Sequence, residues 1–184
     1  MKKLLTISAS AIAALGVLVA SAGLATFTAQ ASTLADYGPA PEIAGIQQWH
    51  NSPALSLASL RGKVVLVDFW TFSCINCIRT LPYVSKWYEQ YKEQGLVVVG
   101  VHTPEFPYER DAKNVATAIQ RFSLRYPVAQ DNRYATWRNY DNQYWPASYL
   151  IDKQGRVRMK HFGEGNYAET ESAIRQLLAE PVTR

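Results

Sequence analysis

The stretch VVLVDFWTFSCINCIRTLP, residues 64–82, decides the fold of this chain. Its first part, residues 64–70, is an almost wholly apolar run rich in β-branched and aromatic residues, which predicts a buried central strand. A helical pattern follows from Cys74 to about Gln94, where a glycine stops it. Both cysteines of the chain, Cys74 and Cys77, stand where the strand gives way to the helix. A C-x-x-C at such a junction indicates a redox-active dithiol.

The spacing of the two cysteines favours chemistry over structural cross-linking. A disulfide across two intervening residues closes a very small loop, so it would add little to stability. Cys74 is expected at a helix N-terminus, where unsatisfied N–H groups and the helix dipole favour a thiolate. Cys77 lies one turn further in and is expected to be less exposed. We therefore expect Cys74 to attack a substrate disulfide and Cys77 to resolve the mixed disulfide.

Strands and helices alternate along the rest of the chain. Short strands are expected at 42–48, 96–101, 128–129, 148–151 and 156–162, with a hairpin turn between the last two. Helices are expected at 56–60, 111–122 and 134–140, and after Asn166-Tyr167-Ala168-Glu169, which fits a capping box. This order of elements predicts a single α/β domain around a buried sheet.

The N-terminal segment has the pattern of a secretory signal. Lys2-Lys3 is followed by the mostly apolar residues 4–19, and Ala29-Gln30-Ala31 fits a cleavage site. We expect a signal peptide at 1–31, a linker at 32–41 and a domain at 42–184; an uncleaved membrane anchor is the alternative. Export to the periplasm would place the dithiol in an oxidising compartment. The net charge is +4 with scattered Lys and Arg, so we expect no nucleic-acid partner. We also expect the protein to be a monomer.

Several motifs carry a family resemblance. The pattern Val67-Asp68-Phe69-Trp70-x-x-x-Cys74-x-x-Cys77-x-x-x-x-Pro82 resembles the active-site segment of thioredoxins. Residues 145–157, WPASYLIDKQGRV, resemble the stretch of exported TlpA/ResA-like thiol-disulfide proteins that contains the cis-proline, and residues 101–106, VHTPEF, resemble DipZ-type proteins. The resemblance covers about residues 40–180. It implies a thioredoxin fold with a central mixed β-sheet flanked by helices, an N-terminal extension and a TlpA-like β-α insertion.

The resemblance also implies roles for individual residues. Asp68 matches the buried acid that moves the proton of the resolving cysteine, and burial would raise its pKa towards neutrality. Pro146 matches the cis-proline beside the dithiol. We expect substrate contacts from Pro146, Trp145, Ser73 and Trp70, and we also expect Trp70 to pack beneath the active site. Trp145 would offer its backbone to an extended substrate segment.

Two positions depart from the family pattern. Ser73 stands where thioredoxins and most TlpA-like proteins have Trp, which removes an aromatic lid. Ile75-Asn76 separates the cysteines, so no cationic side chain between them stabilises the thiolate. We therefore expect a reducing to intermediate potential.

Together these features predict an exported protein disulfide oxidoreductase that acts as a reductase without cofactor or metal. Its expected partners are protein disulfides, such as apocytochrome c, and a membrane electron donor of thiol type. A thiol peroxidase is one alternative, because Thr71-x-x-Cys74 is similar to the T-x-x-C of peroxiredoxins. A copper or zinc module is another; it would add His50, His102 or His161 to the two thiols. His102, Glu105 and Glu164 are further candidates to approach the active site.

Overall fold

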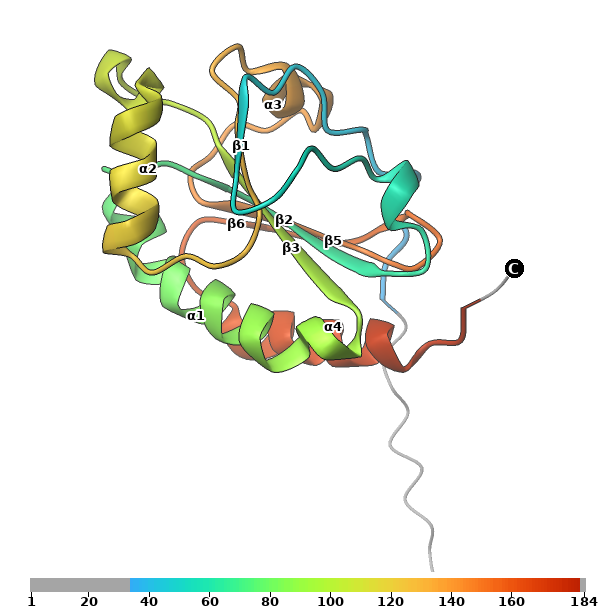
Figure 1. Cartoon of the computed structure of the whole chain (residues 1–184). Coiled ribbons are helices and arrows are strands. Elements are labelled where there is room, and N and C mark those ends of the chain that lie inside the picture. The colour runs from blue at the N-terminus through green and yellow to red at the C-terminus, as the bar shows by residue number, and fades with distance from the viewer. Residues whose placement is uncertain (1–33, 183–184) are drawn as a thin grey trace, which may run out of the picture. The chain divides into compact units, whose positions relative to one another are not determined.

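A mixed six-stranded sheet organises residues 34–182, the part of the chain that this computed structural model describes (Figure 1). The expected signal peptide lies outside these residues. The strand order is β1-β4-β3-β2-β5-β6, in which β2, β3 and β4 are parallel while β1, β5 and β6 run antiparallel to their neighbours. The strands are β1 (Gln48–His50), β2 (Val64–Trp70), β3 (Leu96–His102), β4 (Val128–Gln130), β5 (Ala147–Ile151) and β6 (Val157–Phe162).

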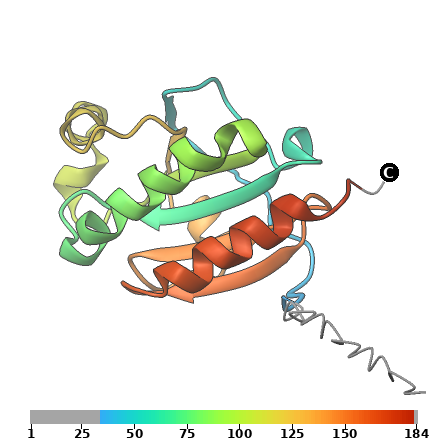
Figure 2. The same cartoon turned by 90° about the horizontal axis from the view of Figure 1, so that it is seen from below.

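Helices cover both faces of this sheet, which confirms the α/β prediction. Figure 2, seen from below, shows the two longest, α1 and α4, side by side in front of the sheet. Between β3 and β5 the chain inserts η3, α2, β4 and α3. No helix within residues 34–182 has both the length and the apolar character needed to cross a bilayer. The helices are α1 (Ile75–Tyr91), α2 (Ala112–Arg121), α3 (Ala135–Asn139) and α4 (Tyr167–Ala179), with 3-10 turns η1 (Ala58–Leu60), η2 (Lys92–Gln94) and η3 (Pro107–Arg110).

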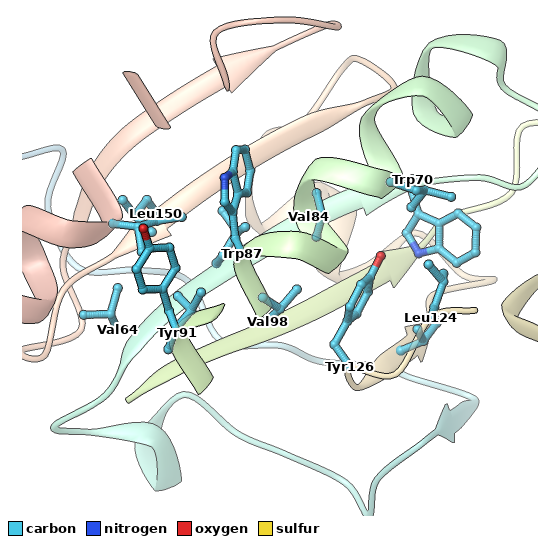
Figure 3. Close-up of a cluster of buried hydrophobic side chains, with 14 of the residues drawn as sticks. Val64, Trp70, Val84, Trp87, Tyr91, Val98, Leu124, Tyr126 and Leu150 are labelled. Atoms are coloured by element: carbon cyan, nitrogen blue, oxygen red, sulfur yellow. The ribbon is translucent and has the colours of Figure 1, made fainter. Parts of the chain in front are cut away.

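Strand β2 is buried on both faces and divides the core in two. Because side chains alternate along a strand, Val64, Leu66 and Trp70 face one way and Val65, Val67 and Phe69 the other. The first set packs with residues of α1, α2 and α4, partly shown in Figure 3. The second set packs with β5, Tyr140 and the N-terminal segment. Asp68 shares the parity of the first set, so the strand directs its side chain toward the α1 side.

Two local expectations were wrong. The strand expected at 42–48 begins only at Gln48 and runs to His50. Glu42 accepts hydrogen bonds from the N–H groups of Ile43 and Leu57, and Gly45 has a φ of 67°, so the residues before Gln48 are not in a strand. No capping box forms at α4. Asn166 has a left-handed backbone with a φ of 55° and makes no side-chain capping bond.

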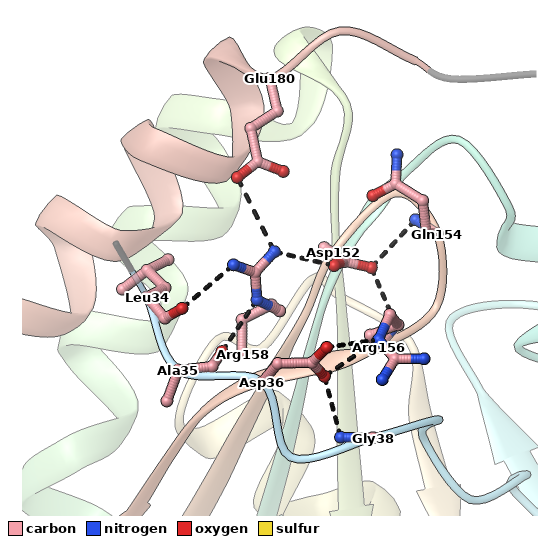
Figure 4. A network of polar contacts seen from close by, with 9 residues as sticks. All are labelled: Leu34, Ala35, Asp36, Gly38, Asp152, Gln154, Arg156, Arg158 and Glu180. Atoms are coloured by element: carbon pink, nitrogen blue, oxygen red, sulfur yellow. Dashed lines mark hydrogen bonds and ion pairs between the residues drawn. The ribbon is translucent and has the colours of Figure 1, made fainter. Parts of the chain in front are cut away.

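The segment from Leu34, expected as part of a linker, lies against β6 and the turn before it (Figure 4). The Tyr37 N–H donates to the Val157 carbonyl at 2.9 Å. Arg158 donates to the carbonyls of Leu34 at 3.1 Å and Ala35 at 2.8 Å. Its guanidinium also pairs with the buried Asp152 at 3.1 Å. These bonds join the first described residues to the C-terminal hairpin.

Candidate active site

Cys74 is the N-cap residue directly before helix α1. Its backbone is extended, and its Sγ accepts a hydrogen bond from the Cys77 N–H at 3.3 Å. The largest effect on its pKa is the hydrogen bond with the Cys77 side chain, which lowers it; burial raises it, and backbone N–H groups of Cys77 and Asn76 lower it. The resulting pKa is about 6, so Cys74 is mostly a thiolate at neutral pH.

Cys77 differs sharply from its neighbour in exposure. Its side chain is buried in the cluster formed by α1 and the sheet, whereas Cys74 is partly exposed. Burial is the largest effect on its pKa and raises it, and the hydrogen bond to Cys74 raises it further. Both thiols are free. This difference is the one that an attacking and a resolving thiol require.

Asp68 is a buried carboxyl group on the α1 side of β2. It is 1% exposed, and neither of its carboxylate oxygens has a hydrogen-bond partner. Burial alone raises its pKa to about 8. Its charge raises the pKa of Cys77, so the two groups interact. A carboxyl that titrates near neutral pH beside a protonated thiol can exchange a proton with it.

Residues that are distant in the sequence complete the site, because the start of β5 lies beside the end of β2. The Trp145–Pro146 peptide bond is cis, as predicted. The Cys74 thiol donates to the Trp145 carbonyl at 3.9 Å, so residues 71 positions apart meet at the dithiol. The Trp145 indole N–H donates to the Thr103 carbonyl at 3.0 Å, which fixes the ring.

Trp70 does not fit its predicted contact with substrate. Its side chain is completely buried, and its ring meets His102 edge-on at 5.0 Å. The residue lies at the last position of β2 with the parity of Leu66, and therefore faces the core. Trp70 supports the active-site loop from below and is out of reach of a protein substrate.

Ser73 is exposed beside Cys74, as a substrate contact would be, but its hydroxyl is already bonded. It donates to Glu109 at 2.5 Å and accepts from the Tyr108 hydroxyl at 3.1 Å. Glu109 is a buried residue that the sequence interpretation missed. Pro107 at the first position of a turn with Glu109 at its third was the available signal, because such a pair commonly starts a helix.

The three further candidates have different surroundings. His102 is the last residue of β3 and is buried, with Nε2 3.4 Å from the Thr71 hydroxyl. Burial lowers its pKa to about 4, so the ring is neutral. Glu105 is exposed, and electrostatic repulsion from its negative charge raises the pKa of the Cys74 thiol. Glu164 forms an exposed ion pair with Arg79 at 3.5 Å.

The metal alternative finds no ligand set within residues 34–182. No three His, Cys, Asp or Glu side chains there form a group that could hold a metal ion. His50 lies 3.5 Å from Gln130, and His161 belongs to β6. The two thiols therefore lack the third and fourth ligands that a structural zinc site needs.

Comparisons with known proteins agree with this geometry. The AhpC/TSA family model matches residues 39–160. DipZ of Mycobacterium tuberculosis is 54% identical over 151 residues, which cover 80% of this chain but only 22% of DipZ. The thiol-disulfide oxidoreductase ResA of Bacillus cereus is 31% identical over 123 residues, covering 67% of this chain and 68% of ResA.

A solved structure identifies the fold. The crystal structure of a thioredoxin-like superfamily protein superposes with a TM-score of 0.73 at 29% identity, covering 79% of this chain and 99% of that one. The predicted thioredoxin fold is thereby confirmed. The chain belongs to the AhpC/TSA family and is a TlpA/ResA-like member of the thioredoxin superfamily.

Proposed function

We propose that this chain is a thiol-disulfide oxidoreductase that reduces disulfides of other proteins through Cys74 and Cys77. The observation that carries the proposal is the unequal environment of the two thiols. Cys74 is accessible, with its pKa lowered to about 6, while Cys77 is buried with its pKa raised. The match to ResA covers 67% of the present chain, and ResA is itself a thiol-disulfide oxidoreductase.

The reaction proceeds in two exchanges. The Cys74 thiolate attacks one sulfur of the substrate disulfide, forming a mixed disulfide and releasing the other substrate sulfur as a thiolate, which takes up a proton. Cys77 then loses its proton and attacks Cys74 Sγ, which releases the second substrate thiol. The substrate gains two electrons and two protons, and Cys74–Cys77 becomes a disulfide.

Asp68 supplies the base for the second exchange. The Cys77 thiol needs a proton acceptor because burial raises its pKa. Asp68 is the buried carboxyl whose charge acts on Cys77, and its pKa of about 8 allows it to accept and return a proton near neutral pH. A water molecule between the two groups would serve the same transfer.

The substrate segment is proposed to lie in extended form beside Trp145 and Pro146. The Trp145 carbonyl lies 3.9 Å from Cys74 Sγ, so a backbone group that could bond an extended chain is next to the nucleophile. Strand-like pairing of this kind binds many sequences, because it uses main-chain groups. Protein substrates, among them apocytochrome c, suit such a site.

The cellular setting follows from residues 1–31, which have the pattern of a signal peptide. We propose that the chain is exported to the periplasm and acts there as a monomer. A reductase in an oxidising compartment needs electrons from the cytoplasm, so a membrane donor of thiol type would return Cys74–Cys77 to the dithiol.

The reduction potential of the Cys74–Cys77 pair is the decisive measurement. A value near that of thioredoxin, about −270 mV, is expected, and a value near that of DsbA, about −120 mV, would reverse the proposed direction. Cys74→Ser should abolish the reduction of insulin disulfides, whereas Cys77→Ser should accumulate the mixed disulfide. A Cys74→Ser variant with wild-type turnover contradicts the mechanism, and hydrogen peroxide turnover faster than insulin turnover favours the peroxidase alternative.

A further inference from the structure

Glu109 lies beneath the active-site loop but takes no part in the exchange described above. Its side chain is completely buried in η3. Oε1 accepts hydrogen bonds from the Ser73 hydroxyl at 2.5 Å and the Ser73 N–H at 3.3 Å. Oε2 accepts from the N–H groups of Glu105 at 2.6 Å and Phe106 at 2.9 Å. One carboxylate thus ties the residue before Cys74 to the loop that follows β3.

No cation neutralises this carboxylate. Its hydrogen-bond donors are uncharged, and within residues 34–182 no Lys, Arg or His forms an ion pair with Glu109. His102 faces it but is neutral, and the exposed Glu105 adds negative charge. Burial would raise the pKa of Glu109, but the hydrogen bonds from Ser73, Thr71 and the backbone outweigh it and lower that pKa. Glu109 is therefore ionised at neutral pH.

We propose that Glu109 is a positioning residue that fixes Ser73 beside the dithiol and places there a negative charge that keeps the Cys74–Cys77 pair reducing. The inference rests on the proposed exchange reaction. A nearby negative charge disfavours the Cys74 thiolate. A less stable thiolate makes the dithiol less stable relative to the disulfide, and the reduction potential falls.

Ser73 weakens this effect of the Glu109 charge on Cys74. Its hydroxyl accepts from Tyr108 at 3.1 Å and donates to Glu109, so the three side chains form a chain that ends at the buried charge. The hydroxyl hydrogen partly offsets that charge. Loss of the carboxylate and loss of the hydroxyl should therefore shift the pKa of Cys74 in opposite directions.

The test compares Glu109→Gln with the charge-retaining Glu109→Asp in the full chain. Reduction potentials are measured in dithiothreitol and glutathione redox buffers, and the pKa of Cys74 from the pH dependence of its alkylation. Glu109→Gln should lower the pKa of Cys74 and raise the potential by a tenfold change in the equilibrium constant, about 30 mV for two electrons. Glu109→Asp should stay near the wild type.

A folded Glu109→Gln protein with the wild-type potential and alkylation profile would overturn the inference. Ser73→Ala tests the proposal independently, even if the Glu109→Gln protein does not fold. It keeps the charge and should raise the pKa of Cys74; an unchanged or lower pKa contradicts the proposal. Insulin reduction by the same samples separates failure of the role proposed for Glu109 from failure of the proposed function. If the wild type does not reduce insulin, the proposed function is refuted.

Discussion

At the residue scale, the buried carboxyl group of Asp68 lowers the stability of the fold. Its carboxyl is 1% exposed and without a hydrogen-bond partner, which is rare because an unpaired buried charge is costly. Burial raises its pKa from 3.8 to about 8. A residue that stability alone would remove is therefore present near the dithiol, where the proposed proton transfer needs it.

Asp68→Asn should stabilise the protein in a pH-dependent way. The folded pKa is above the unfolded one, so the contribution of Asp68 to stability is fully present below about pH 4 and is lost as the pH rises to about 8. Between these values the stability of the variant relative to the wild type should grow by at most about 1.4 kcal/mol per pH unit. Urea unfolding at pH 5 and pH 8 measures this gain.

A matched carboxyl control is Asp111→Asn. Asp111 caps α2 by accepting from the Lys113 N–H, a bond that Asn also makes, and it is exposed. This variant measures the effect of an Asp-to-Asn exchange at an exposed carboxyl group. If the stability of Asp68→Asn relative to the wild type is the same at both pH values, burial of the charged Asp68 carboxylate does not destabilise the protein, and the prediction is wrong.

At the element scale, β2 and β3 position α1 and the residues beneath it. Asp68 pairs with Gly100 across the two parallel strands. The absence of a side chain at Gly100 makes room for two aromatic rings: a Cβ there would lie 2.9 Å from Tyr126 Cε2 and 3.1 Å from Trp70 Nε1. The aromatic layer below the active site therefore depends on one glycine in a strand.

Gly100→Ala should destabilise the fold by about 1–3 kcal/mol, because a methyl group would be forced into a packed core. Chemical denaturation measures the loss. Tyr126→Leu in the same background should recover part of it, since the nearer of the two rings is removed. Strict additivity of the two changes would mean that the clash with Tyr126 is not the cause.

At the scale of the whole described domain, one arginine joins segments from its two ends. Arg158 on β6 bonds the carbonyls of Leu34 and Ala35, pairs with Asp152, and lies 3.9 Å from Glu180 beyond α4 (Figure 4). Asp152 is 2% exposed and also accepts from backbone N–H groups of its own turn. The segment that begins at Leu34 is therefore part of the stable domain.

Arg158→Ala should lower the free energy of unfolding by about 2–3 kcal/mol, because it leaves the buried Asp152 carboxylate without its cation. Thermal or urea unfolding measures the loss. The control is Arg156→Ala, which breaks the exposed pair with Asp36, where both side chains are over 40% exposed. That change should cost clearly less than Arg158→Ala, because solvent screens an exposed ion pair. Equal losses would mean that the pairing of Arg158 with Asp152 adds nothing.

Local patterns in the sequence were enough for most elements. The helix expected at 74–94 is α1 followed by η2, and the strand expected at 64–70 is β2. The errors at residues 42–48 and at Asn166 arose where left-handed backbone and side-chain-to-backbone bonds override propensity. Side-chain bonding of this kind depends on partners that no short window contains.

By itself, the sequence determined the fold class and the dithiol and predicted the order in which its two thiols act, because periodicity, C-x-x-C spacing and helix position are local properties. Only the tertiary structure decided which distant groups act on that dithiol. It brings Trp145 to Cys74 across 71 positions and Glu109 to Ser73 across 36, and it buries Trp70 away from substrate. Hydrogen bonding and burial depend on packing between segments, so these contacts and the pKa values they set exist only in the folded chain.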